Sequence, residues 1–356
     1  MRPPSFASGL VLALALLSAN AARADFDAGN AAFKREDYAT ALKAWLESGN
    51  AGDARSQERL GAMYHDGAGI PRDDAQAVSW YRKAARQGNA AAQFALGSMY
   101  LNGQGVVQDN LYAAGWFRKA AAQGHAGAQL QLGKMYGDGI GVPRDGALWV
   151  SWMRKAADQS DAAAQAELAS LYYVGSGVPE DRSESLALYL KSAAQGRAES
   201  QYEVGFDYAV GIGTKADSVV ALSWYRKAAE QGQATAQYEM GSSYEWGDGV
   251  QQNIAQAAIW YRKAAQQGNL KAQDRLGRFY NLGESMPKDD AQAYIWFKKV
   301  ADAKDVGESD RAVQRHAQKL LAWTYHLGSG APRDDAQASV WMRAALHGPS
   351  PMKPPA

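Results

Sequence analysis

The sequence predicts an all-α protein: a right-handed α/α solenoid of stacked helix hairpins, with about eight repeat units and one further hairpin at the N-terminus. Two recurring motifs predict this fold. The first reads W-Y-R-K-A-A or a close variant and begins at Trp80, Trp116, Trp152, Tyr189, Trp224, Trp260, Trp296 and Trp341. The second centres on a small residue, which stands at Gly61, Gly97, Gly133, Ala169, Gly205, Gly241, Gly277 and Ala322. The first seven of these small residues are 36 positions apart, a period typical of helical repeat arrays.

Each repeat unit is predicted to contain two helices joined by a loop. In one representative unit, apolar residues at positions i, i+4 and i+8 predict a first helix over residues 90–101, which Gly103 and Gly105 end. Asp109 is placed to cap the free N–H groups of a second helix over residues 110–123. We expect the equivalent capping residues to be Asp73, Asp145, Asp181, Asp217, Asn253, Asp289 and Asp334.

Small residues and aromatic pairs are predicted to hold the hairpins together. A glycine or alanine at the recurring position lets two helices approach closely. The aromatic pair on the second helix, such as the pair that begins at Trp224, is expected to be buried between adjacent hairpins. A single hairpin cannot bury both of its apolar stripes, so stacked neighbours are expected to bury them jointly.

The first 24 residues have the features of a secretory signal peptide. Arg2 supplies a positive charge, residues 10–17 form an apolar run, and residues 22–24 form a small-x-small cleavage site. The apolar run is shorter than the roughly 20 residues that span a bilayer. We therefore expect a mature chain that begins at Asp25 and resides in the periplasm of a Gram-negative-type cell, or is secreted further.

The remaining chain is predicted to have three parts. Residues 25–50 form an N-terminal helix pair, residues 51–348 form the repeat solenoid, and residues 349–356 form a proline-rich, disordered tail. The last two copies of the first motif are 45 positions apart instead of 36. The nine additional residues, near residues 304–311, are expected to lengthen a loop or a helix.

Charge and cysteine content exclude several classes of function. The formal net charge is +1, which gives no electrostatic reason to expect a nucleic-acid partner. The chain has no cysteine, so disulfides, thiolate metal sites and cysteine nucleophiles are excluded. No stretch after the signal peptide is apolar enough to span a membrane, and we expect no integral membrane segment after cleavage.

The repeated residues resemble the Sel-one-like repeat family, a relative of the tetratricopeptide repeats. The family pattern A-x-x-x-L-G-x-x-Y, G-x-G-V-x-x-D and A-x-x-W-Y-x-K-A-A-x-Q-G recurs eight times over roughly residues 54–348. The helix pair at residues 25–50 is closer to an ordinary tetratricopeptide unit. The resemblance implies a superhelical scaffold that binds proteins or peptides, in bacteria often within the cell envelope.

The sequence contains no arrangement of residues typical of an active site. Its five histidines form no H-x-x-x-H or H-E-x-x-H pair, and we expect His65 and His326 at the ends of first helices. One S-x-x-K motif, Ser285 to Lys288, falls in an expected loop and lacks the S-D-N and K-T-G partners of penicillin-recognising enzymes. We therefore expect no catalytic residue, no metal site and no cofactor.

Pairs of basic residues recur on the second helices. They stand at Arg82–Lys83, Arg118–Lys119, Arg154–Lys155, Arg226–Lys227, Arg262–Lys263 and Lys298–Lys299. One interpretation is a stripe that faces an anionic polymer. The other is a solvated helix face whose charges pair with loop acids such as Asp73–Asp74, Glu180–Asp181 and Asp289–Asp290.

Aromatic residues on the first helices of the middle units form the predicted protein-binding surface. If first helices line the concave side of the solenoid, Tyr202, Phe206 and Tyr238 face a ligand, and Trp246 begins the loop nearby. Clustered exposed aromatic residues are typical of binding hot spots. The alternative is that neighbouring repeats bury these side chains.

These observations favour a non-enzymatic scaffold that binds a protein or peptide partner in the cell envelope. A second hypothesis is a structural component of an envelope or polysaccharide-associated assembly, in contact with a cell-wall polymer. A third is an enzyme that binds or hydrolyses β-lactams, which only distant relatives motivate.

Overall fold

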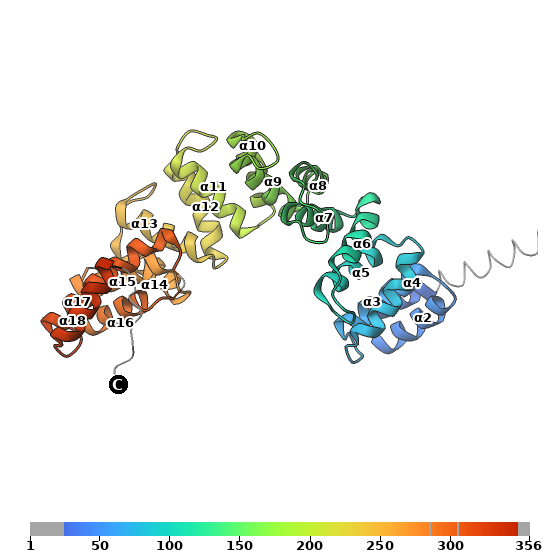
Figure 1. Cartoon of the computed structure of the whole chain (residues 1–356), viewed down its shortest axis with the longest axis horizontal. Coiled ribbons are helices and arrows are strands. Elements are labelled where there is room, and N and C mark those ends of the chain that lie inside the picture. Colours follow the sequence, from blue (N-terminus) through green and yellow to red (C-terminus); the bar gives the residue numbers. More distant parts are fainter. Residues whose placement is uncertain (1–24, 285, 305, 348–356) are drawn as a thin grey trace, which may run out of the picture. The chain divides into compact units, whose positions relative to one another are not determined.

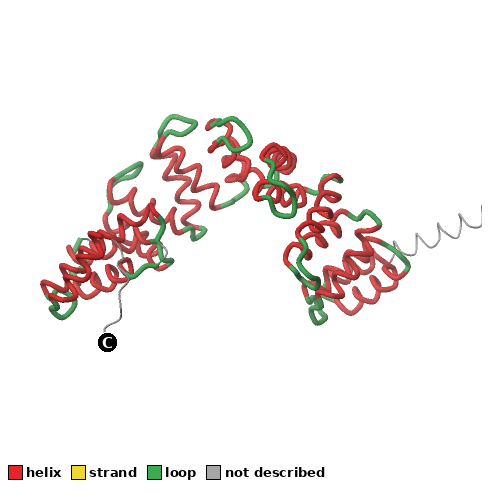
Figure 2. Tube along the Cα trace, viewed as in Figure 1, coloured by secondary structure: helices red, strands yellow, loops and turns green. Residues whose placement is uncertain are grey.

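The described residues form α-helices joined by short turns, with no strand among them. The computed structural model describes residues 25–284, 286–304 and 306–347. Residues 25–34 are helical. The helices that follow are α2 (Tyr38–Asn50), α3 (Ala54–Asp66), α4 (Asp74–Arg86), α5 (Ala90–Asn102), α6 (Asn110–Ala122), α7 (Ala126–Asp138), α8 (Gly146–Asp158), α9 (Ala162–Val174), α10 (Arg182–Ala194), α11 (Ala198–Val210), α12 (Ser218–Glu230), α13 (Ala234–Trp246), α14 (Ile254–Gln266), α15 (Leu270–Leu282), α16 (Asp290–Ala301), the 3₁₀ turn η1 (Glu308–Asp310), α17 (Arg311–Leu327) and α18 (Asp335–His347). The predicted all-α fold of stacked hairpins is confirmed (Figures 1 and 2).

The chain divides into two compact units, which we describe separately. The first unit is residues 1–180 and the second is residues 181–356. In the first unit the hairpins α3–α4, α5–α6 and α7–α8 follow one another, and α2 packs on α3. In the second unit the hairpins are α11–α12, α13–α14, α15–α16 and α17–α18, and α10 packs on α11. Within each unit, helices therefore pack mainly on their neighbours in the chain, as in other repeat arrays.

Local capping interactions fix where each helix begins and ends. In the unit predicted at residues 90–123, α5 ends where Gly103 adopts a left-handed conformation with φ of 68°. The carboxylate of Asp109 accepts a hydrogen bond from the Tyr112 N–H at the start of α6. These predicted bounds are correct to within one residue. Equivalent side-chain caps are present at Asp73, Asp145, Asp181, Asp217, Asn253, Asp289 and Asp334, as predicted.

The recurring small residue lets an aromatic ring lie directly against the backbone of the first helix. A Cβ atom added at Gly97 would lie 2.8 Å from the Phe117 ring, and one at Gly205 would lie 2.6 Å from the Tyr225 ring. Each ring belongs to the second helix of the same hairpin, and it is the second residue of the aromatic pair. This register is buried in seven units, at Tyr81, Phe117, Met153, Tyr189, Tyr225, Tyr261 and Phe297.

The first residue of the pair is less uniformly buried than predicted. Trp116 is buried against α4 and α5, in line with the expected packing between hairpins. Trp224, however, is half-buried, with the Lys227 ammonium 3.7 Å from its ring centroid. The expectation that Trp224 is a core residue is therefore wrong, because its ring lies at the surface edge of the hairpin under a lysine.

The register of the fourth copy of this motif also needs correction. In every other copy of this motif, the tryptophan stands seven residues after the residue that caps its helix, as Trp224 follows Asp217. The same count from Asp181 reaches Leu188, so Leu188 takes the tryptophan position and Tyr189 takes the buried ring position. The predicted alignment that began at Tyr189 was shifted by one residue.

A buried glutamine on most of the first helices connects three helices. Gln93 of α5 donates from Nε2 to the Ala85 carbonyl at the end of α4, at 3.1 Å. Its Oε1 accepts from Gln123 at the end of α6, at 2.8 Å. The same pair of bonds recurs around Gln57, Gln129 and Gln237.

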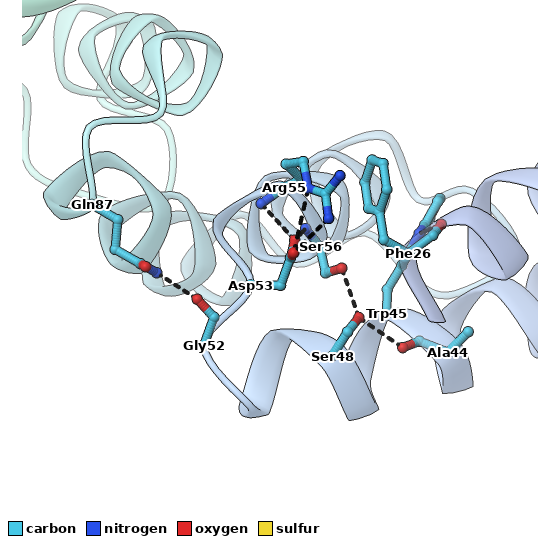
Figure 3. A network of polar contacts seen from close by, with 9 residues as sticks. All are labelled: Phe26, Ala44, Trp45, Ser48, Gly52, Asp53, Arg55, Ser56 and Gln87. Carbon is cyan, nitrogen blue, oxygen red and sulfur yellow. Dashed lines mark hydrogen bonds and ion pairs between the residues drawn. The ribbon is translucent and has the colours of Figure 1, made fainter. Parts of the chain in front are cut away.

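At the N-terminal end, a polar network joins residues 25–34 and α2 to the first repeat (Figure 3). Trp45 is buried and donates from Nε1 to the Phe26 carbonyl at 3.4 Å. The hydroxyl groups of Ser48 on α2 and Ser56 on α3 are hydrogen-bonded at 2.6 Å and buried. Gln87, at the end of α4, donates to the Gly52 carbonyl at 3.0 Å. The helix pair at residues 25–50 thus packs on α3 by the same kind of contact that joins later units.

The last unit departs from the regular repeat in the way that the nine additional residues predicted. The segment forms η1 and lengthens α17 to 17 residues, whereas the first helices of the other units have 13. Gln314 donates to the carbonyls of Ala301 and Ala303, at 3.2 and 2.7 Å. The Gln318 Oε1 atom, in the usual glutamine register, is buried without a partner among the described residues.

The two aromatic registers are expected to differ in their contribution to stability. Replacing Tyr225, which is 4% exposed, by alanine should cost about 3–5 kcal/mol because it empties the space over Gly205. The Trp224→Ala change should cost less, about 1–2 kcal/mol, because that ring is only half-buried. Urea denaturation of both variants measures the difference; a larger loss for Trp224→Ala would contradict this packing.

Candidate functional site

The second unit carries aromatic and acidic residues at equivalent positions of two successive first helices. We define the α11–α13 face as the residues three before, two before and one after the recurring glycine on these helices. It consists of Tyr202, Glu203, Phe206, Tyr238, Glu239 and Ser242. All six side chains are half-buried, which means that each is packed on one side and open on another.

The predicted aromatic residues lie on this face or at its edge. The Tyr202 ring is tilted against Tyr225, with centroids 5.8 Å apart, and Tyr238 is related to Tyr261 in the same way at 5.5 Å. Trp246, at the end of α13, is 60% exposed. The Tyr202 and Tyr238 rings are therefore neither fully exposed nor buried by the next repeat, since each leans on the core ring beneath it. Their role in binding stays a prediction.

Two carboxylates, which were not among the residues predicted from the sequence, lie next to these rings. Burial raises the pKa of Glu203 and of Glu239. Burial, and then the charges of Glu239 and Glu203, raises the pKa of Tyr202 to about 12. Both carboxylates therefore lie within electrostatic reach of one tyrosine hydroxyl, although they belong to different helices. Neither makes a hydrogen bond or an ion pair with any described residue.

The face ends at a cluster in which a carboxylate is fully paired. Glu245 is buried on α13, and its Oε2 accepts a hydrogen bond from the Tyr261 hydroxyl at 2.6 Å. Its Oε1 lies 3.3 Å from Arg275 Nη1, and the same guanidinium lies 5.7 Å from the Trp246 ring centroid. This part of the surface shows how a cation is held between a carboxylate and an indole.

A cavity adjoins the face at Tyr238. It has a volume of about 580 Å³ and lies between the start of α15 and the segment inserted before α17. Its lining includes Tyr238, Lys271, Lys304 and Asp310, together with Gly268 and Asn269 of the α14–α15 turn. The insertion thus adds a hollow beside the predicted aromatic surface.

A buried acid in α11 was also missed. Asp207 is 1% exposed, and neither carboxylate oxygen has a hydrogen-bond partner among the described residues. Burial, and then the charge of Glu203, raises its pKa to about 7. The equivalent residues in the first unit are apolar, at Met63, Met99, Met135 and Leu171. An acid at a position that is apolar in the first unit is the signal in the sequence that would have identified Asp207.

The basic pairs of the second helices contact aromatic residues. Lys119 lies over Trp116 of its own helix, with its ammonium 4.3 Å from the ring centroid. Arg118 donates to the Tyr136 hydroxyl of the next repeat at 3.3 Å. The loop acid Asp74 pairs instead with Arg72 at 2.8 Å. Asp290 likewise pairs with Lys288, so the partners seen for Asp74 and Asp290 are loop residues and not the basic pairs of the second helices.

The histidines and the S-x-x-K motif take up the following positions. His65 and His326 lie in the last turns of α3 and α17, as predicted, and bond Asp74 and Asp335 at 2.7 Å. Among the residues that the structure describes, no group of three or more His, Asp or Glu could hold a metal ion. Ser285 lies outside the described residues, and Lys288, in the loop before α16, pairs with Asp290, the first residue of that helix.

No helix in the described ranges is both long enough and apolar enough to cross a membrane.

Fold and surface together define a helical repeat protein, an α/α solenoid with an aromatic and acidic face on its first helices. The Sel1 repeat matches residues 54–89, 90–125, 126–161, 162–196, 198–233, 234–269, 270–305 and 315–347. The chain therefore belongs to the Sel1 repeat family, and the resemblance found in the sequence is confirmed.

Two solved structures support the same assignment. One is c5321, described as a protective antigen present in uropathogenic Escherichia coli strains and displaying an SLR fold. It is 33% identical with a TM-score of 0.65, and the match covers 91% of this chain and 76% of that one. The other is a Sel1 repeat protein from Oxalobacter formigenes, also 33% identical with a TM-score of 0.65, with 85% and 86% covered. No curated protein matches the chain by sequence.

Asp207 is expected to make stability depend on pH. Its folded-state pKa of about 7 is above the ordinary value of 3.8, so its stabilising contribution is present at low pH and is lost as pH rises toward and through 7. Asp207→Met should remove this loss. The variant should therefore gain free energy of unfolding relative to wild type, and the gain should be larger at pH 8 than at pH 5.5 by on the order of 2 kcal/mol. Urea denaturation at both pH values measures the difference.

Ser243→Met is the matched control for this change, because Ser243 occupies the equivalent register on α13 without a charge. Its effect should be the same at pH 5.5 and pH 8. A pH-independent effect of Asp207→Met would show that the Asp207 carboxyl is not strained in the folded protein.

Proposed function

We propose that this protein is a non-enzymatic scaffold of the bacterial cell envelope whose α11–α13 face binds a protein or an extended peptide. Sel1 repeat proteins generally mediate protein–protein interactions. The observation that carries the proposal for this chain is the repeated ring of the α11–α13 face: Tyr202 and Tyr238 stand at equivalent positions on successive first helices, each leaning on a core tyrosine.

The packing of the Tyr202 and Tyr238 rings favours binding. Each is held against a core tyrosine, so little side-chain entropy remains to be lost when a partner binds. Tyrosine and tryptophan are enriched at hot spots, where a ring offers both apolar area and a polar group. Trp246 extends the surface at the end of α13.

The non-enzymatic part of the proposal is supported by the family, which is generally non-catalytic. The His65 and His326 side chains bond carboxylates that cap or begin helices, which accounts for them as structural groups. The β-lactam hypothesis has an independent test. Incubation of the protein with a labelled β-lactam should give no covalent adduct.

A structural role with an anionic cell-wall polymer is the second candidate, favoured by the recurring Lys and Arg side chains of the second helices. Binding through these charges should weaken steeply as salt rises, whereas binding through the aromatic face should change little. The lysines already lie over tryptophan rings, as Lys83 does over Trp80 at 3.6 Å. Because these lysines already contact rings of the protein, binding of a polymer is the less favoured of the two functions.

The envelope location rests on residues 1–24, which lie outside the described residues. Export predicts a mature chain that begins at Asp25, because Ala22–Ala24 forms the small-x-small site; Ala19–Ala21 offers a competing site. N-terminal sequencing of the protein from the envelope fraction measures the start directly. Recovery only from the cytoplasm, with Met1 retained, would refute export.

The aromatic face is tested by the double change Tyr202→Ala with Tyr238→Ala. Truncation of hot-spot rings typically costs about 2 kcal/mol or more in affinity. We expect loss of the partners recovered by crosslinking from the envelope fraction, with a small change in thermal midpoint, because the core rings Tyr225 and Tyr261 remain.

The control is Val219→Ala with Ile259→Ala, which removes exposed apolar side chains from second helices of the same unit. This variant should keep its partners. If instead the tyrosine variant unfolds at a much lower temperature, the rings are core residues and the binding assignment fails.

A further inference from the structure

We propose that the exposed side of α17 binds a segment of a partner protein in which acidic residues adjoin apolar ones. The surface consists of every fourth residue of the helix: Arg311, Arg315, Lys319, Trp323 and Leu327. We call these five residues the α17 ridge. The inference rests on the proposed scaffold function for the nature of the partner, a protein, and adds a second surface with its own chemistry.

The α17 ridge is a line of exposed side chains that changes from basic to apolar. Residues four apart lie one above the other on a helix, and all five side chains are exposed. Trp323 is 54% exposed and Leu327 is 67% exposed. The position of Trp323, directly after the recurring small residue, is an alanine or a serine in four other units: Ala62, Ser98, Ser170 and Ser242. A tryptophan here contributes little to the core and offers a large apolar surface to a partner.

The basic half of the ridge has no counter-charge on its own helix. α17 contains no acid, and Arg311, Arg315 and Lys319 form no ion pair with any described residue. Glu308 and Asp310 lie just before the helix, but Arg315 and Lys319 are more than one turn further along. Like charges four residues apart repel one another and destabilise a helix. A carboxylate bound along the ridge would relieve this repulsion.

The neighbouring helix adds one more cation to this surface. α15 lies beside α17, and its single acid, Asp274, is hydrogen-bonded to His316 of α17 at 3.0 Å. Both are first helices and run in the same direction. Arg278 follows Asp274 by one turn, as Leu320 follows His316, so Arg278 stands level with the point where Lys319 gives way to Trp323.

The other cations of α15 are already engaged, which limits the surface. Arg275 pairs with Glu245 at 3.3 Å, and Lys271 lies 6.0 Å from the Tyr238 ring centroid. Arg278, by contrast, forms no ion pair with a described residue. The cations available to a partner are therefore those of the α17 ridge and Arg278.

The geometry of the ridge defines the partner. Arg315 and Trp323 are eight residues apart on one helix, which corresponds to about 12 Å. An extended peptide covers that distance in about four residues. Arginine holds a carboxylate through two parallel hydrogen bonds, and tryptophan and arginine are the residues most enriched at binding hot spots. An acidic peptide with apolar residues uses both halves of the ridge, whereas an anionic polymer has no apolar group for Trp323.

The probe is a labelled octapeptide with blocked ends, in which four acidic residues precede four apolar ones. Two comparison peptides separate the contributions: one carries lysine in place of the acids, and the other carries serine in place of the apolar residues. Fluorescence anisotropy at physiological salt should show binding of the acidic–apolar peptide, weaker binding of the serine peptide and no binding of the lysine peptide. Because exposed charges are screened, the affinity should fall as salt rises.

Two double variants test the charges. Arg315→Gln with Lys319→Gln removes two charges and keeps residues that favour a helix, and it should weaken binding of the acidic–apolar peptide by about tenfold or more. Lys191→Gln with Lys215→Gln is the matched control. It removes the same charge from exposed lysines of α10 and of the loop before α12, and it should leave the affinity within about twofold of wild type.

Trp323→Ala tests the apolar half of the ridge. This variant should bind the acidic–apolar peptide no better than the serine peptide, because the ring that distinguishes the two is gone. Thermal midpoints of all these variants should stay near that of wild type, since every changed side chain is exposed.

Several results would overturn the proposal. One is no binding of the acidic–apolar peptide to the wild-type protein, and another is an equal loss in both double variants. Tighter binding of inorganic polyphosphate, unchanged by Trp323→Ala, would assign the ridge to an anionic polymer. Self-association that Arg315→Gln with Lys319→Gln abolishes would assign it to a second copy, whose α11 and α13 carry acids and no lysine or arginine.

Failure of this inference can be separated from failure of the proposed function. Tyr202→Ala with Tyr238→Ala should bind the acidic–apolar peptide as wild type does, because these tyrosines lie on other helices. If the peptide does not bind wild type while the tyrosine variant still loses its envelope partners, only the α17 assignment fails. If the peptide binds the ridge while the tyrosine variant keeps every partner, the assignment of the α11–α13 face fails alone.

Discussion

The hydrogen bonds of a buried glutamine, present on most of the first helices, are the interaction on which the stacking depends. Gln93 is hydrogen-bonded to the last turn of the preceding repeat through Ala85 and to the end of its own hairpin through Gln123. Breaking one such bond leaves a buried polar group unsatisfied, at a cost of about 1–3 kcal/mol. The amide therefore fixes the position of each hairpin relative to the one before it, while apolar packing supplies most of the stabilisation.

Two further constraints keep this geometry constant from repeat to repeat. A glycine such as Gly241 leaves space for the Tyr261 ring within its hairpin. The second loop glycine, Gly105 for example, has a φ of 67°, and a Cβ there would collide with the backbone at Asp74 of the preceding repeat. Because backbone and rings are so closely placed, an insertion is accommodated at the end of the array, where Gln314 takes over the bond to Ala301.

Once glutamines, small residues and rings have fixed the stacking, only a few positions of each first helix remain free to vary. The residue types at those positions change from unit to unit: Phe94 stands there in α5, Arg275 in α15, and a tyrosine with a glutamate in α11 and α13. A half-buried acid such as Glu203, whose pKa is raised by burial, destabilises the fold slightly. Residues of this kind at variable positions are where a repeat protein acquires a specific partner.

The sequence by itself determined the class of fold, the helix bounds and the caps, because these depend on local patterns: a 36-residue period, left-handed glycines such as Gly103, and capping acids such as Asp109. It also located the aromatic residues Tyr202 and Tyr238. Only the tertiary structure decided that Tyr225 is core and Trp224 is not, since both lie on one helix and their burial depends on the facing glycine. Likewise, only packing between successive first helices brings Glu203 and Glu239, 36 residues apart, to the same tyrosine.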